Sequence, residues 1–114
     1  MAVVRRYKET KAIPYGRGVV KRILIGPKQG APTFVMRIIE LESGASSPDH
    51  SHDWEHEVFI LSGKGVVVTE NGESAIRAED AVFVPPDEVH CFRNTGQASL
   101  RFMCLVPVRG EDTP

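Results

Sequence analysis

Four histidines are the residues of this chain best suited to act together in chemistry. His50, His52 and His56 lie within seven residues, and His90 stands alone further along the chain. On a strand, alternate side chains point to the same face, which would place the Cβ atoms of His50 and His52 about 6–7 Å apart. A neutral imidazole nitrogen is a common metal ligand. The pattern therefore predicts one metal ion held by this pair, a third ligand after a short turn, and His90 from a distant strand.

The third ligand is open between two neighbouring residues, His56 and Glu57. They would point to opposite faces of a strand, so only one of them should bind the same ion. His56 shares its face with Val58 and Ile60, while Glu57 shares its face with Phe59 and Leu61. Both faces are apolar, and alternation alone does not decide. The plain alternative to a metal site is a local cluster of packed or exposed histidines, with Glu57 a surface carboxylate.

The elements that must position these side chains are short strands. The chain has 114 residues, enough for one domain with one core. Its 10 glycines and 8 prolines separate short apolar runs, which is typical of an all-β protein. No segment shows a convincing apolar helical stripe with caps. Strands are predicted at residues 19–25, 33–41, 54–61, 65–70, 74–78, 81–84, 89–93 and 99–106, and Asn71-Gly72 predicts a hairpin.

Composition excludes several classes of protein. The net charge is −1, with 25% charged residues, so a basic nucleic-acid surface is not expected. Residues 1–10 lack the apolar core of a signal peptide, and no run approaches the length of a membrane span. The two cysteines, Cys91 and Cys104, do not make a disulfide framework. We expect a cytoplasmic protein whose partners are neither nucleic acid nor membrane.

Two motifs around the histidines resemble those of the cupin superfamily. The first runs from Gly44 through residues 50–52 and Glu57 to Gly63, and the second consists of Pro85, Asp87, His90 and Asn94. The family prefers glycine where this chain has Glu79 and Asp87, a difference that concerns turn shape and not the ligand positions. The resemblance implies one cupin domain, an all-β double-stranded β-helix or jelly-roll barrel. Its core would span about residues 19–107, with an N-terminal arm at 1–18 and a short tail at 108–114.

The resemblance also bears on the ligands. Residues 50–57 and 102–107 look close to small four-histidine cupins of thermophiles, which bind manganese or a related metal. This favours His56 over Glu57 and implies the ligand set His50, His52, His56 and His90. Ligand softness suits iron, copper, nickel, cobalt or zinc, and only the resemblance recommends manganese. The cofactor is therefore expected to be one divalent transition metal among manganese, iron, nickel, cobalt, copper and zinc.

A substrate pocket around the ion is predicted from alternation. In the last strand Phe102, Cys104 and Val106 point inward, opposite to Arg101, Met103 and Leu105. Phe92 should share the direction of His90, and Trp54 is placed to cap the entrance. Arg37 either faces the cavity and holds a substrate carboxylate or lies on the surface opposite Glu40. The predicted pocket residues are Arg37, Trp54, Phe92, Phe102, Cys104 and Val106. The outward Met103 and Leu105 predict a homodimer.

Four neutral imidazoles leave a divalent ion its full charge, which favours anionic oxygen ligands at any open position. We therefore expect a metal-dependent oxidoreductase, dioxygenase-like, acting on a small organic molecule, with no single residue assigned as catalytic. Zinc held by a tetrahedron of four histidines would instead be structural. The alternatives are a non-catalytic cupin that binds a small ligand or a metal, as a sensor or store, and a metal-dependent isomerase or decarboxylase. The fold alone does not decide among them.

Overall fold

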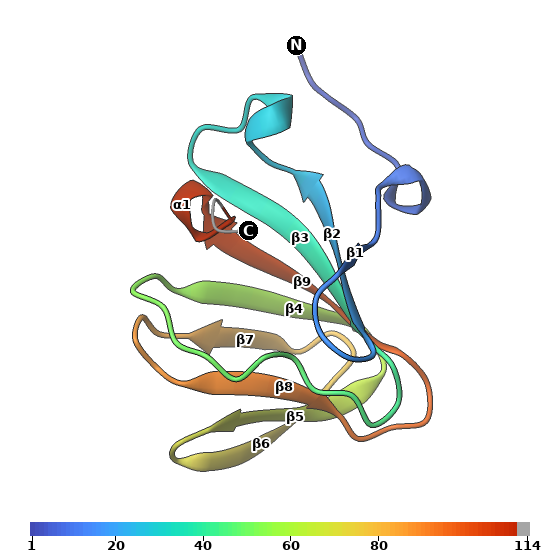
Figure 1. The fold of residues 1–114 in the computed structure, drawn as a ribbon, viewed down its shortest axis with the longest axis vertical. Helices are drawn as coiled ribbons and strands as arrows, with labels where there is room; N and C mark the ends of the chain where they lie inside the picture. The colour runs from blue at the N-terminus through green and yellow to red at the C-terminus, as the bar shows by residue number, and fades with distance from the viewer. Residues whose placement is uncertain (112–114) are drawn as a thin grey trace.

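Two antiparallel sheets build the molecule, here a computed structural model that describes residues 1–111 (Figure 1). The six-stranded sheet has the order β1-β2-β3-β9-β4-β7, and the three-stranded sheet has the order β6-β5-β8. The strands are β1 (Ile13–Pro14), β2 (Val19–Ile25), β3 (Phe34–Leu41), β4 (His56–Ser62), β5 (Lys64–Thr69), β6 (Gly72–Arg77), β7 (Ala81–Val84), β8 (His90–Asn94) and β9 (Leu100–Pro107). Short helices are η1 (Tyr7–Glu9), η2 (Pro27–Gln29) and α1 (Val108–Glu111).

The core lies between the sheets and follows the alternation of their strands. In β9, Phe102, Cys104 and Val106 are buried, whereas Arg101, Met103 and Leu105 are half-buried, which confirms the predicted directions. β9 is central because it pairs with β3 on one side and β4 on the other. Burial of apolar side chains from both sheets in this one layer supplies the main stabilisation of the fold. The architecture is the predicted mostly β, jelly-roll type.

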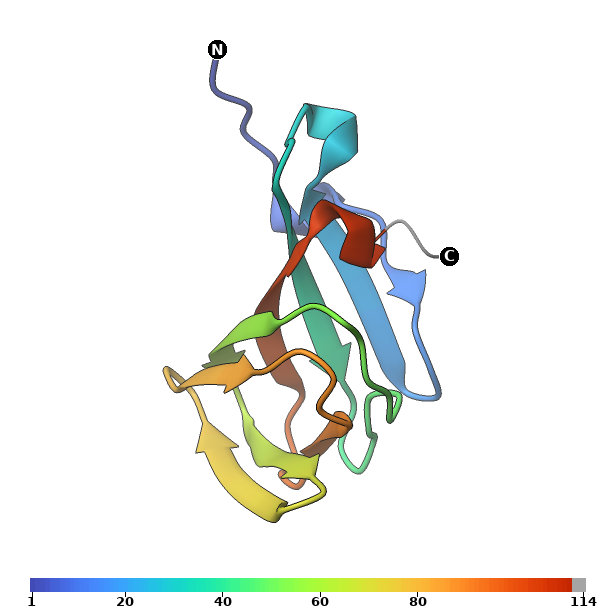
Figure 2. The same cartoon turned by 90° about the vertical axis from the view of Figure 1, so that its left-hand side faces the viewer.

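All eight predicted strands form, and β2 and β7 have the predicted bounds. The sequence reasoning missed β1 and α1, each too short to leave a periodic pattern. The N-terminal arm is therefore not wholly separate, because Ile13 and Pro14 pair with Lys21 and Val20 at the edge of the large sheet. Of the predicted tail, residues 108–111 form α1, and residues 112–114 lie outside the described residues. Figure 2 shows α1 lying beside the β2–β3 pair.

Two turns keep a backbone shape that normally calls for glycine. Among residues 1–111, Glu79 (φ 74°) and Asp87 (φ 68°) are the non-glycine residues with positive φ. They are the two positions where the cupin pattern prefers glycine. The turn geometry is therefore kept while the side chain changes, at a cost of roughly 1–2 kcal/mol per residue.

The β5–β6 hairpin forms where Asn71-Gly72 predicted it, although the turn differs in detail. Thr69 pairs with Gly72, so Glu70 and Asn71 are the linking residues. Only Gly72 of this turn has a positive φ, at 116°. Separately, no helix within residues 1–111 is long and apolar enough to cross a membrane.

Candidate metal centre and pocket

The backbone brings the two histidine-bearing motifs together. His50 and His90 form an isolated bridge, in which each N–H donates to the other's carbonyl, at 3.2 Å from His50 and 3.0 Å from His90. The preceding loop runs along β8, with Ser47 donating to the Phe92 carbonyl at 2.8 Å. The sequence analysis assumed that the His-x-His pair lies on a strand. The structure places it instead on a loop that is hydrogen-bonded to β8.

All four histidine rings gather at one place in the interior. Ring centroids are 4.3 Å apart for His50 and His52, 4.8 Å for His56 and His90, and 5.2 Å for His50 and His90. The remaining three pairs lie between 5.4 and 6.5 Å. Residues from β4, from β8 and from the loop before β4 therefore meet, as the sequence reasoning required of a shared site.

The choice between His56 and Glu57 is settled as far as direction is concerned. His56 is 6% exposed and faces the other three histidines, while Glu57 points outward and is exposed. The reason is the pairing of β4 between β7 and β9, which turns His56, Val58 and Ile60 toward the small sheet. Only His56 is therefore placed to join the cluster.

Two of the rings have nitrogens whose roles follow from their partners. His90 Nδ1 lies 2.9 Å from the Glu88 carbonyl oxygen, which can only accept, so Nδ1 donates this hydrogen bond and a metal would have to bind through Nε2. His56 Nδ1 lies 3.3 Å from Cys104 Sγ, and among the described residues its buried Nε2 has no hydrogen-bond partner. An unpartnered buried nitrogen is costly, and a bound cation would satisfy it.

Three of the four histidines, His50, His52 and His56, are held in the neutral form by their surroundings. Burial, helped by the neighbouring histidines and Arg37, lowers the pKa of His56 to about 3. Burial also lowers the pKa of His50 to about 4, with His52 and His90 adding to the effect. The pKa of His52 is lowered too, again mainly by burial. Neutral imidazole is the form that binds metals, so at neutral pH no proton has to leave first.

The residues therefore fit a divalent transition metal in the chemistry of their donors, four imidazoles of which three are held neutral. Across residues 1–111, no group of three or more His, Cys, Asp or Glu side chains is arranged as a ready-made metal site. The rings gather without their donor nitrogens forming a finished set.

The predicted pocket residues divide between the interior and the surface. Arg37 is 5% exposed, so the alternative of a surface arginine is wrong. Its Nη2 donates to Cys104 Sγ at 3.0 Å, next to His56. Phe92 packs on Phe102 with ring centroids 4.6 Å apart, and His90 lies beside Phe92 at 6.3 Å. The interior beside the histidines thus contains four of the predicted pocket residues: Arg37, Phe92, Phe102 and Cys104.

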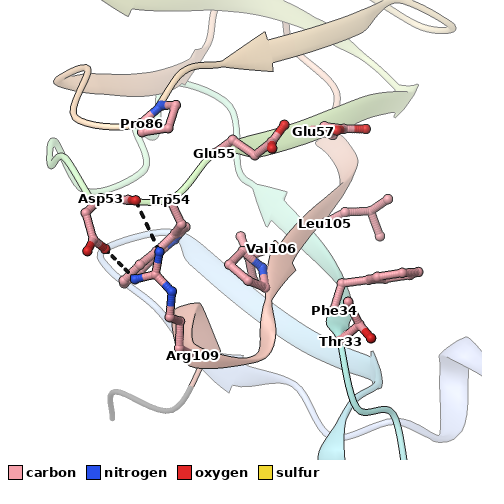
Figure 3. Close-up of a pocket in the computed structure, with 11 residues that line it drawn as sticks. Thr33, Phe34, Asp53, Trp54, Glu55, Glu57, Pro86, Leu105, Val106 and Arg109 are labelled. Carbon is pink, nitrogen blue, oxygen red and sulfur yellow. Dashed lines mark hydrogen bonds and ion pairs between the residues drawn. The ribbon is translucent and has the colours of Figure 1, made fainter.

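Trp54 forms the wall between the histidines and an outer cavity. Its ring stacks on His52 with centroids 4.4 Å apart and planes 6° apart. The cavity outside it has a volume of about 530 Å³ (Figure 3). Figure 3 shows Arg109 reaching Asp53 beside Trp54, with Arg109 Nη1 and Asp53 Oδ1 2.6 Å apart. Of the predicted pocket residues, Trp54 and Val106 line this cavity, together with Thr33, Phe34, Asp53, Glu55, Glu57, Pro86, Leu105, Pro107 and Arg109.

The sequence reasoning missed two charged residues near the site. Lys21 and Glu111 are both largely buried and pair with one another. Lys21 could have been noticed as a charge at an inward position of β2, by the same alternation that singled out Arg37. Nothing in the sequence marks Glu111, because its contacts depend on how α1 folds back.

Comparison with known proteins gives a family and several relatives. The model of the cupin domain family matches residues 37–106. The 1-methylthio-D-xylulose 5-phosphate methylsulfurylase of Rhodospirillum rubrum is 31% identical over 100 residues, which cover 88% of this chain and 62% of that protein. The oxalate-binding protein of Thermotoga maritima is 33% identical over 69 residues, covering 60% and 57%. The chain thus spans about three fifths of the length of these curated relatives.

Solved structures agree on the fold. The polyketide cyclase RemF from Streptomyces resistomycificus superposes with a TM-score of 0.86 at 28% identity, covering 95% of this chain and 80% of that one. A predicted oxalate decarboxylase from Thermotoga maritima superposes with a TM-score of 0.78 at 27% identity, covering 92% and 98%. Proteins of this shape therefore include small-molecule enzymes and binders of differing chemistry.

Proposed function

The chain belongs to the cupin domain family, and on this premise we propose that it is a metal-dependent enzyme. It acts on a small organic molecule at one mononuclear site formed by its four histidines, His50, His52, His56 and His90. The observation that carries the proposal is the meeting of four imidazole rings, one of which has a buried nitrogen without a partner among residues 1–111. A surface cluster of histidines would leave such a nitrogen to water.

The reaction that we propose is an oxidoreductase reaction of the dioxygenase type. A divalent transition metal with neutral ligands keeps its full charge, supplies Lewis acidity and, for manganese, iron, cobalt or copper, supplies redox chemistry. The chain's own part is to prepare the surroundings. Phe92 and Phe102 keep water away from one side of the histidines, and Trp54 holds the ring of His52 by stacking. The Glu88 carbonyl fixes the His90 ring through its Nδ1 proton.

A second candidate is chemistry without a change of oxidation state. The relative named oxalate-binding protein favours a non-catalytic binder of small anions, and the one named methylsulfurylase favours a non-oxidative enzyme. A metal-dependent isomerase or decarboxylase would use the same neutral ligand set. Both readings keep the four-histidine site, and in neither of them is oxygen consumed.

Oxygen uptake separates the two candidates. Purified chain is loaded in turn with Mn²⁺, Fe²⁺, Co²⁺, Ni²⁺, Cu²⁺ or Zn²⁺ and given a panel of small hydroxy and keto acids under an oxygen electrode. We expect uptake with at least one redox-active metal, its loss in His52→Ala, and unchanged uptake in Glu70→Gln, an exposed turn residue. Zinc as the only tightly bound ion, with no uptake under any loading, would leave the binder or the non-oxidative enzyme.

We also propose that the chain is a homodimer, as the outward apolar residues predicted. The outer face of the large sheet exposes Phe34 (57%), Phe59 (39%) and Phe83 (59%). A second hollow of about 550 Å³ lies on this face between Phe59, Phe83 and Met103. A second copy would cover these rings, since exposed apolar patches mark contact surfaces.

The free cysteines, Cys91 and Cys104, support the proposal of a reducing, cytoplasmic setting.

A further inference from the structure

Two cations are buried side by side on the inner face of the large sheet. Lys21 on β2 is 8% exposed and Arg37 on β3 is 5% exposed. The register pairs Arg37 with Ile23 and Lys21 with Ile39, so the two side chains are diagonal neighbours on the same face. Burying two positive charges is expensive unless an anion meets them. The sheet therefore presents a fixed site for an anion.

The anion that meets them is the side chain of Glu111. Its Oε2 lies 2.8 Å from Lys21 Nζ, and its Oε1 lies 3.1 Å from Arg37 Nη1. Each carboxylate oxygen thus has its own cation, an arrangement in which a planar carboxylate binds strongly. Arg37 Nε is buried and has no partner among residues 1–111, so one donor of the site is still open.

Glu111 comes from a short helix, of which Val108 also packs against the core. The helix α1 has four residues, and Val108 donates to the Thr33 carbonyl at 3.0 Å. Arg109 pairs with Asp53, but both side chains are more than half exposed. Exposed pairs of this kind contribute little to stability. Lys21 and Arg37, by contrast, belong to strands that are hydrogen-bonded on both sides.

The cation pair is linked to the histidine site through Cys104. Arg37 Nη2 donates to Cys104 Sγ at 3.0 Å, and Cys104 Sγ lies 3.3 Å from His56 Nδ1. A small molecule whose carboxylate lay on Lys21 and Arg37 would therefore extend toward the histidines. The occupied position of Glu111 is the position that such a carboxylate needs.

We propose that Lys21 and Arg37 form a carboxylate-binding subsite, which Glu111 occupies as an internal stand-in until a carboxylate ligand displaces it. The ligand is then a small organic acid. That this acid is a substrate rests on the proposed function, in which the four histidines hold a metal ion. Displacement loosens the end of α1, because it removes the contacts of Glu111 while Val108 stays packed against the core. The same subsite would bind a carboxylate whether or not a metal is present.

The affinity for carboxylates tests the subsite. Acetate and oxalate are titrated by calorimetry into metal-free wild type and Glu111→Gln, with Glu70→Gln as the matched control in an exposed turn. We expect Glu111→Gln to bind oxalate at least about tenfold more tightly than wild type, because the internal competitor is gone. The control should match wild type, and Lys21→Met combined with Glu111→Gln should return binding to the weak level. Equal binding by wild type and Glu111→Gln, or tighter binding of inorganic phosphate than of oxalate, would overturn the inference.

The single tryptophan gives a second readout that needs no variant at Glu111. Trp54 packs closely against Gly110 of α1, where an added Cβ would lie 2.8 Å from Trp54 Nε1. Oxalate that displaces Glu111 in the wild type should therefore change Trp54 fluorescence, and it should not do so in Lys21→Met. A wild-type signal that does not respond to saturating oxalate would contradict displacement. Because both tests use metal-free protein, they can succeed while metal loading fails, and the reverse.

Discussion

The inner and outer faces of the large sheet are made by the same strands, yet they hold very different residues. Along β4, His56, Val58 and Ile60 are buried, while Glu57, Phe59 and Leu61 are exposed. Inside, Arg37 is paired with Cys104 and Glu111, while the buried Nε2 of His56 has no partner among residues 1–111. Outside, three phenylalanines have no cover within the described chain. The inner face thus carries the proposed metal site, and the outer face carries the proposed contact surface.

Adjacent residues of β4 give the largest expected contrast. Ile60 is fully buried and Leu61 is 38% exposed. Truncation of Ile60 to Ala should cost about 2–5 kcal/mol, because it removes buried contacts and leaves a cavity. Truncation of Leu61 to Ala should cost about 0.5 kcal/mol or less. Urea unfolding of both variants measures the difference, and similar losses at the two positions would contradict the assignment of faces.

Acid should weaken the inner face first. Unfolded histidines take up protons near their ordinary pKa of about 6.5, whereas in the fold the pKa is about 4 for His50 and about 3 for His56. Between these values the unfolded state binds more protons, so stability falls as the pH falls from about 6.5 toward 4. Urea midpoints from pH 7 to 4.5 should show this decline. In the double variant His50→Gln and His56→Gln, the urea midpoint should depend less steeply on pH. An unchanged dependence on pH would contradict this explanation.

The outer face is tested by its state of association. Phe83→Asp places a charge in the exposed apolar surface and should halve the molar mass seen by light scattering, from dimer to monomer. Val4→Asp, at an exposed position of the N-terminal arm, is the matched control and should leave the mass unchanged. A wild type that is already monomeric at high concentration would remove the need for a partner on this face.

The smallest expected effects lie in the two turns that belong to neither face. Glu79→Gly should stabilise the protein by up to about 1 kcal/mol, because glycine takes a positive φ without strain. Asp87→Gly should gain less, since aspartate tolerates this region better. Thermal unfolding of both variants checks the order. A loss of stability in Glu79→Gly would show that its side chain contributes more than its backbone costs.

The sequence predicted the parts of the molecule that depend on local pattern. Alternation assigned Phe102, Cys104 and Val106 to the interior, and the histidine spacing singled out all four rings. Alternation also showed that His56 and Glu57 diverge, but it could not say which one points inward. That depends on which face of β4 the second sheet covers, and both faces of the strand are apolar.

The buried charges show the other limit of sequence reasoning. Arg37 could be read as buried or exposed, since one arginine in an apolar strand does either. Its partner Glu111 stands 74 residues away, in a helix of four residues with no periodic pattern. The pairing of Lys21, Arg37 and Glu111 exists only because the strands and α1 fold back on each other. No local feature of the sequence encodes such a contact.

The metal content of three proteins tests the central claim most directly. Wild type, His56→Ala and Glu57→Gln are loaded with each of the six divalent metals, dialysed and assayed for bound ion per chain. Wild type and Glu57→Gln should each hold one ion, and His56→Ala should bind at least about a hundredfold more weakly, since it loses a ligand. A Glu57→Gln protein without metal beside a fully loaded His56→Ala protein, or a wild type that retains none of the six metals, would contradict the four-histidine site.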